Sequence, residues 1–172
     1  MADVALLVID MLNDFVLPGA PLEVPEARKI IPAIRKRIED ARKSGIPVIY
    51  VCDAHSEDDP EFKIWPRHAV KGTRGAEVVD ELSPLGTDTI VEKTTYSAFY
   101  GTNLEATLKD KGIGRLVLVG ILTNICVFFT AADAVMRGFE VEVPRDCVAA
   151  ATQEEHRYAL EQMEKVLKVR LT

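Results

Sequence analysis

The sequence is poor in cysteine, histidine and tryptophan, and the shortage of cysteine argues against a disulfide-stabilised protein. Its 172 residues include three cysteines, three histidines and one tryptophan. An odd number of cysteines without a CxxC pair argues against a disulfide framework and fits a reducing compartment. Repeats, low-complexity tracts and linker-like boundaries are also missing. We therefore expect one domain that spans residues 1–172.

A basic excess and a long hydrophobic run are missing too. The formal net charge is −6, which gives no electrostatic reason to expect nucleic acid or an anionic membrane as a partner. The apolar run at residues 4–9 is too short to span a bilayer. The N-terminus also lacks the basic region and cleavage site of a signal peptide. We expect a cytoplasmic protein.

What the sequence does contain is a regular alternation of strand and helix patterns. Apolar runs predict strands at residues 4–9, 46–52, 89–91, 115–119 and 139–143, with a sixth, edge strand at 166–171. Helical patterns are found at about 29–44, 76–81, 102–111, 123–138 and 152–165. Capping boxes at Thr102–Glu105 and Thr152–Glu155 open two of them. This order predicts an α/β fold, a Rossmann-like three-layer α/β/α architecture with a mostly parallel sheet of five to six strands.

Ionisable side chains follow the ends of several predicted strands. They are Asp10, Asp53, His55, Lys93 and Cys126. The carboxyl ends of parallel strands meet at one edge of a sheet, where sites of such folds lie. We therefore expect these five side chains to share one site. His156, by contrast, falls on an exposed helix face and is interpreted as a surface residue.

Cys126 is the candidate nucleophile. With Thr123 as N-cap it lies in the first helical turn, where free N–H groups and the helix dipole favour a thiolate. Asp10 can take the thiol proton and return it to a leaving amine, while Lys93 stabilises both anions. The N–H groups of Leu122 and Cys126 can form an oxyanion hole. The alternative is structural: a small buried thiol, a strand-end carboxylate and a solvated lysine.

The pair Asp53-x-His55 is the candidate metal site. Its side chains point to one side of an extended backbone, and His68 can complete a three-ligand set. Such a set suits a divalent metal, zinc first, with iron, manganese or cobalt as alternatives. Without a metal, the same residues would be an ordinary loop histidine and strand-end aspartate.

These motifs together resemble the nicotinamidase/isochorismatase-like cysteine hydrolase superfamily over nearly the whole chain. The matching pieces are Val8–Phe15, Asp53–His55, Trp65–His68, Glu92-Lys93, Tyr96–Phe99, Gly101-Thr102 and Gly120–Val127. The resemblance implies the isochorismatase-like hydrolase fold and a catalytic triad of Asp10, Lys93 and Cys126. It also implies a cis peptide just before Leu122 that turns the Leu122 and Cys126 amides into the oxyanion hole.

The nicotinamidase branch of that superfamily implies a substrate pocket. There the metal, on residues matching Asp53, His55 and His68, holds the pyridine nitrogen of nicotinamide. Aromatic residues that match Phe15 and Trp65 flank the ring. Ala54 and Ala69 depart from the branch, which has tryptophan and cysteine there. The expected pocket residues are Phe15, Ala54, Trp65, Tyr96 and Ile121.

The leading prediction is a metal-assisted cysteine amidohydrolase that converts nicotinamide to nicotinate and ammonia through a Cys126 thioester. The segment 94–102 and the run 53–60 also resemble relatives of N-carbamoylsarcosine amidase, so an N-carbamoyl amino acid is the alternative substrate. A catalytically silent binding protein is a third reading. A thiol redox protein is disfavoured because no resolving cysteine lies near Cys126. The resemblance further implies a homodimer or higher homo-oligomer.

Overall fold

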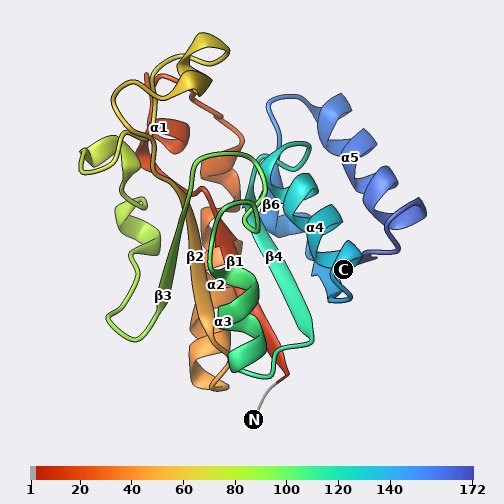
Figure 1. The fold of residues 1–172 in the computed structure, drawn as a ribbon. Coiled ribbons are helices and arrows are strands. Elements are labelled where there is room, and N and C mark those ends of the chain that lie inside the picture. The colour runs from red at the N-terminus through yellow and green to blue at the C-terminus, as the bar shows by residue number, and fades with distance from the viewer. Residues whose placement is uncertain (1–2) are drawn as a thin grey trace.

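A seven-stranded parallel sheet forms the centre of the molecule. The computed structural model describes residues 3–172. The strands are β1 Val4–Ile9, β2 Val48–Asp53, β3 Thr89–Lys93, β4 Arg115–Ile121, β5 Glu140–Val143, β6 Val148–Ala149 and β7 Arg170–Leu171. Their order is β3-β2-β1-β4-β5-β7, and β6 pairs with β4 beyond the end of β5. Figure 1 shows β3, β2, β1 and β4 side by side. All pairings are parallel, which confirms the predicted α/β class with one strand more than expected.

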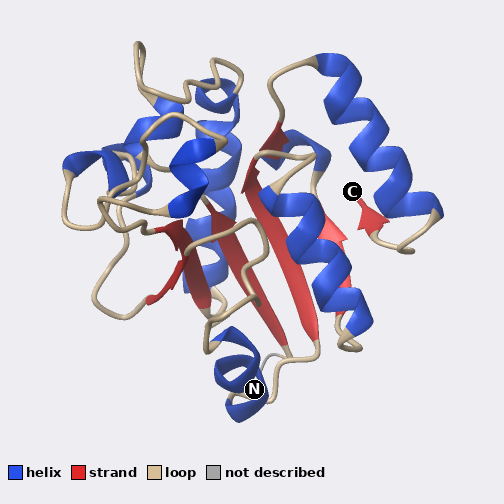
Figure 2. Ribbon diagram, turned by 45° about the horizontal axis from the view of Figure 1, so that its top comes forward, coloured by secondary structure: helices blue, strands red, loops and turns tan. Residues whose placement is uncertain are grey.

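Helices cover both faces of the sheet (Figure 2). They are α1 Asn13–Val16, α2 Ala27–Lys43, α3 Leu104–Asp110, α4 Cys126–Met136 and α5 Gln153–Lys165. The apolar side of α2 packs on one face, while α3, α4 and α5 pack on the other. Every residue of β1 and β2 is buried, as expected of central parallel strands. None of the helices within residues 3–172 is long and apolar enough to cross a bilayer.

The helix expected at residues 76–81 is absent, and that prediction was wrong. Two 3-10 turns, Arg74–Ala76 and Asp80–Leu82, occupy this segment. A six-residue pattern cannot by itself offset the cost of nucleating a helix. Two further 3-10 turns, Pro60–Lys63 and Arg145–Cys147, lie elsewhere in the chain.

The two predicted capping boxes had different outcomes. That of α5 is present, with Thr152 and Glu155 each accepting from the other's backbone N–H. That of α3 is wrong, because Asn103 is the N-cap and makes no side-chain capping bond. The Thr102 hydroxyl instead donates to the Ala98 carbonyl, 2.6 Å away, and so ties the preceding loop.

The carboxyl ends of β1 to β4 bring the predicted site residues to one edge. Asp53 and Lys93 are direct neighbours in the β2–β3 register. On β4, Gly120 faces Ile9 and has a φ of 115°. A Cβ at this position would lie 2.0 Å from the Ile9 carbonyl oxygen, so only glycine lets β4 approach β1 this closely.

Candidate active site

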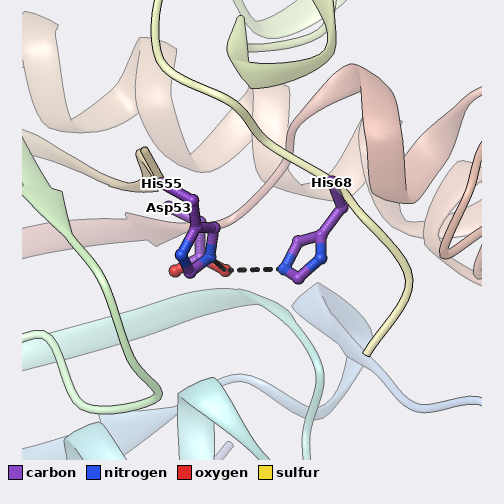
Figure 3. Close-up of side chains that lie close together, drawn as sticks. All are labelled: Asp53, His55 and His68. Atoms are coloured by element: carbon purple, nitrogen blue, oxygen red, sulfur yellow. Dashed lines mark ion pairs between the residues drawn. The ribbon is translucent and has the colours of Figure 1, made fainter. Parts of the chain in front are cut away.

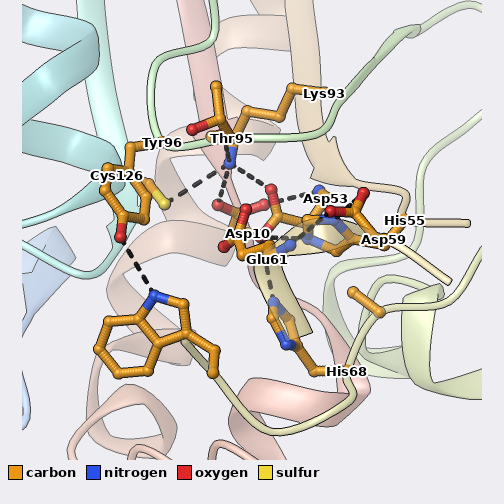
Figure 4. Close-up of polar contacts among 12 residues, drawn as sticks. Asp10, Asp53, His55, Asp59, Glu61, His68, Lys93, Thr95, Tyr96 and Cys126 are labelled. Atoms are coloured by element: carbon orange, nitrogen blue, oxygen red, sulfur yellow. Dashed lines mark hydrogen bonds and ion pairs between the residues drawn. The ribbon is translucent and has the colours of Figure 1, made fainter. Parts of the chain in front are cut away.

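Lys93 lies at the centre of the site, at the end of β3, and is 1% exposed. Its Nζ atom is 2.8 Å from Asp10 Oδ2 and 3.5 Å from Cys126 Sγ (Figure 4). It also donates to Asp53 Oδ1 and to the Thr95 carbonyl. A buried ammonium is tolerated only when its protons are paired in this way. The structure thus brings Asp10, Lys93 and Cys126 together, as expected from the sequence.

Asp10 follows β1 directly and is buried. Its Oδ1 atom accepts the Asp53 N–H at 2.9 Å, which fixes the orientation of the carboxylate. Burial and the neighbouring Asp53 charge raise the pKa of Asp10, against the opposing effect of Lys93, to about 6. Asp10 is therefore mostly ionised at neutral pH and has a higher proton affinity than an ordinary aspartate.

Cys126 is the first residue of α4, and the expected N-cap was wrong. Ile125 occupies the N-cap, because the buried Thr123 donates its N–H to the Ala149 carbonyl and its hydroxyl bonds His156 on α5. Burial raises the pKa of the Cys126 thiol well above its ordinary value, although Lys93 opposes this. The resting group is a thiol rather than the thiolate that the helix start favoured, so it needs a base.

Two backbone N–H groups are free beside the thiol. The Ile121–Leu122 peptide bond is cis, as the family resemblance implied. Among the described residues, neither the Leu122 N–H nor the Cys126 N–H has a hydrogen-bond acceptor. Both residues line the cavity described below. The turn between β4 and α4 therefore offers two unpaired donors next to Cys126.

Asp53, His55 and His68 converge as a metal-competent set (Figure 3). Asp53 Oδ2 is 3.6 Å from His55 Nε2 and 3.9 Å from His68 Nε2. The Nδ1 atoms of both histidines bond other groups. His55 Nδ1 bonds Asp59 at 3.0 Å, and His68 Nδ1 bonds the Pro66 carbonyl at 2.6 Å. His55 Nε2 is buried without a partner. Oriented imidazoles with free Nε2 atoms beside a carboxylate fit a divalent cation.

Burial and neighbouring charges shift the pKa values of the two imidazoles in opposite directions. Burial disfavours a charged His55, but the nearby Asp53 and Asp59 carboxylates outweigh it and raise the pKa of His55 to about 9. Burial lowers the pKa of His68. Metal ligation needs the neutral form of an imidazole. Protons therefore compete with a metal for the ring nitrogens of these histidines.

The sequence reasoning missed two acidic residues, Asp59 and Glu61. Asp59 orients His55 and also caps the 3-10 turn by accepting the Glu61 N–H at 2.9 Å. Glu61 lines the cavity, and burial raises its pKa. Together with His55 they form a second group whose ligand atoms lie within 4.8 Å of one another. The spacing of Asp59 four residues after His55 was the signal available in the sequence.

A cavity of about 400 Å³ opens over these groups. Of the expected pocket residues, Phe15, Trp65, Tyr96 and Ile121 line it. Ala54 does not line this cavity and lines a separate hollow instead, so its expected role was wrong. Trp65 Nε1 donates to Tyr96 Oη at 3.1 Å and joins two loops at the cavity wall. The cavity is thus partly aromatic and has the thiol at its base.

Comparisons with known proteins identify the family of the chain. The family model described as "Isochorismatase domain" matches residues 4–172. The uncharacterized isochorismatase family protein PncA of Bacillus subtilis is 40% identical over 167 residues, covering 91% of each chain. The crystal structure of N-carbamoylsarcosine amidase from Thermoplasma acidophilum superposes with a TM-score of 0.90 at 43% identity, over 98% of this chain and 95% of that one. A pyrazinamidase of Pyrococcus horikoshii in complex with zinc gives 0.93 at 36% identity, over 99% of both chains.

Proposed function

The chain belongs to the isochorismatase domain family, and from this membership and the geometry of its buried site we propose a cysteine amidohydrolase that releases ammonia from nicotinamide. The observation that carries the proposal is the position of Lys93 Nζ, 2.8 Å from the Asp10 carboxylate and 3.5 Å from the Cys126 sulfur. A nucleophile, a base and a cation therefore meet at the base of one cavity. Relatives with solved structures include a nicotinamidase/pyrazinamidase, which supports an amide substrate.

The proposed mechanism uses Asp10 twice. Asp10 takes the Cys126 proton while the sulfur attacks the amide carbon, and the N–H groups of Leu122 and Cys126 bind the developing oxyanion. The C–N bond then breaks, and Asp10 returns the proton to the leaving ammonia. Water, deprotonated by Asp10, attacks the thioester, so that the carboxylic acid leaves and the thiol is restored. Lys93 stabilises the ionised Asp10 and the thiolate throughout.

Asp53, His55 and His68 would hold a divalent metal, and zinc suits this donor set best, with iron, manganese and cobalt as alternatives. When bound, such an ion supplies a Lewis-acidic contact for a ring nitrogen of the substrate. Phe15 and Trp65 line the same cavity and would flank an aromatic ring. The His55 Nε2 atom, buried without a partner, supports this use of the site.

A second candidate substrate is an N-carbamoyl amino acid. The 43% identity to the N-carbamoylsarcosine amidase of Thermoplasma acidophilum favours it. The same triad would cleave its terminal C–N bond with release of ammonia. Three expectations stay predictions from the sequence. They are a catalytically silent binding role as the alternative to catalysis, assembly into a homo-oligomer, and a cytoplasmic location.

Ammonia release from nicotinamide tests the proposal. We expect Cys126→Ala to reduce release to background, and Asp10→Asn to reduce kcat by about 10²–10⁴-fold, the usual contribution of a general acid–base. Cys147→Ala is the matched control, because Cys147 is a buried thiol outside the cavity. Undiminished activity of the Cys126→Ala protein would rule out the covalent mechanism.

A further inference from the structure

The charged residues that line the cavity are all acidic. Among the described residues, five carboxylates line it and no lysine or arginine does: Asp10, Glu23, Asp53, Glu61 and Glu155. A site built for a substrate that carries a carboxylate normally places a cation, above all an arginine, on its wall. The wall of this cavity has none.

Three of these five carboxylates form ion pairs, so their charges contribute less to the electrostatic potential at the entrance of the cavity. Lys93 lies behind Asp10 and Asp53 and forms ion pairs with both. Glu23 is compensated by Arg28, whose guanidinium is 2.8 Å away. Glu155 is exposed and, among the described residues, makes no salt bridge. Among the described residues, Glu61 and Glu155 are the two lining carboxylates without a salt bridge, and Glu155 is the exposed one of the two.

Glu155 also lies in the first turn of α5, a helix end on this wall that would attract an anion. The N-terminus of α5 presents free N–H groups and the positive end of its dipole. The Glu155 carboxylate accepts from the Thr152 N–H at 3.1 Å and from the Thr152 hydroxyl at 2.8 Å. A substrate carboxylate approaching this helix end would meet a carboxylate already in place.

We propose that Glu155 is a specificity-determining residue that selects uncharged amides and rejects amides that carry a carboxylate. The inference rests on the proposed function and decides between its two candidate substrates. Nicotinamide is uncharged, whereas an N-carbamoyl amino acid brings a negative charge to the outer wall. Two like charges about 4 Å apart in water change an equilibrium by about fivefold, and added salt screens this effect.

Steady-state kinetics with two amide substrates test the proposal. We expect Glu155→Gln to lower the ratio of kcat/KM for nicotinamide to kcat/KM for N-carbamoylsarcosine by about fivefold, through the KM of the charged substrate. Glutamine at this position keeps the capping box, so the fold is retained. Added salt should lower the same ratio in the wild-type protein and have little effect on it in Glu155→Gln.

Glu164→Gln is the matched control, since it removes the same charge from the far end of α5, outside the cavity, and should leave the ratio unchanged. A Glu155→Gln ratio equal to the wild-type ratio would overturn the selectivity role while leaving the amidohydrolase intact. So would a wild-type protein that prefers N-carbamoylsarcosine. If the wild-type protein hydrolyses neither amide, the proposed function fails and the inference fails with it.

Discussion

A single ammonium group holds the buried charges of the site together. Without Lys93, the Asp10 and Asp53 carboxylates would be two like charges beside a buried thiol, and ionising either would be costly. With it, Asp10 keeps a pKa of about 6 while the Cys126 thiol stays protonated. Both groups therefore rest in the protonation states from which the proposed transfer starts, an ionised carboxylate and a protonated thiol.

His156 is less exposed than the sequence predicted. The sequence placed it on an exposed helix face, but its ring is half-buried and its Nδ1 atom is 2.8 Å from the Thr123 hydroxyl. The α5 pattern identified the helix correctly. It could not show that the β4–α4 turn packs against this face, because that contact joins segments 33 residues apart. The interpretation of His156 as a surface residue was therefore wrong.

Burial, and next the nearby Arg145 charge, lower the pKa of His156 in the folded protein. The unfolded chain, with a pKa of about 6.5, takes up a proton first as the pH falls. His156 should therefore destabilise the fold as the pH falls through about 6.5 towards the folded pKa, and have no such effect above this range. Urea unfolding near pH 8 and near pH 5 should show a smaller loss of stability in His156→Gln than in the wild-type protein. Equal losses would contradict the assignment.

At the scale of elements, the sequence predicted strands better than helix ends. Strand positions follow from apolar runs, and five predicted runs coincide with β1 to β5. Helix ends depend on which polar group bonds which partner. Thr102 bonds the Ala98 carbonyl as well as the Leu104 N–H, and Thr123 bonds His156 on α5, so neither is the N-cap that the sequence predicted. Local sequence shows that these residues can cap, and only the tertiary contacts show that they do not.

The close approach of β4 to β1 should depend on Gly120. A Cβ there would lie 2.0 Å from the Ile9 carbonyl oxygen at a φ of 115°. We expect Gly120→Ala to lower the free energy of unfolding by about 2–4 kcal/mol, from steric overlap and backbone strain, and to reduce ammonia release by displacing the adjacent turn. Urea denaturation measures the first effect. Gly114→Ala is the control, because a Cβ at Gly114 meets open space. Similar stabilities for the two variants would contradict this packing.

At the scale of the whole molecule, the strand order makes the site. The strands β3, β2, β1 and β4 are neighbours, so their ends place Lys93, Asp53, Asp10 and Cys126 along one edge. The sequence predicted that these groups share an edge, since parallel strands end together. It could not give the order, because several right-handed α/β topologies fit the same alternation. Nor could it bring Glu155 to the wall, since that depends on how α5 docks.

The metal-competent set links the end of β2 to the loop that carries His68, so occupancy should stabilise the whole fold. A ligand that binds only the folded state adds about 2.7 kcal/mol at a concentration one hundred times its Kd. We expect zinc to raise the Tm of the chelator-treated wild-type protein, measured by calorimetry, and to have little effect on His68→Ala, which lacks one of the three ligands. His156→Gln serves as the control, because it removes a histidine outside this set and should keep the zinc-dependent rise. An equal rise in His68→Ala would show that zinc binds elsewhere. Because Tm does not depend on turnover, this measurement tests the metal set separately from the Cys126 chemistry.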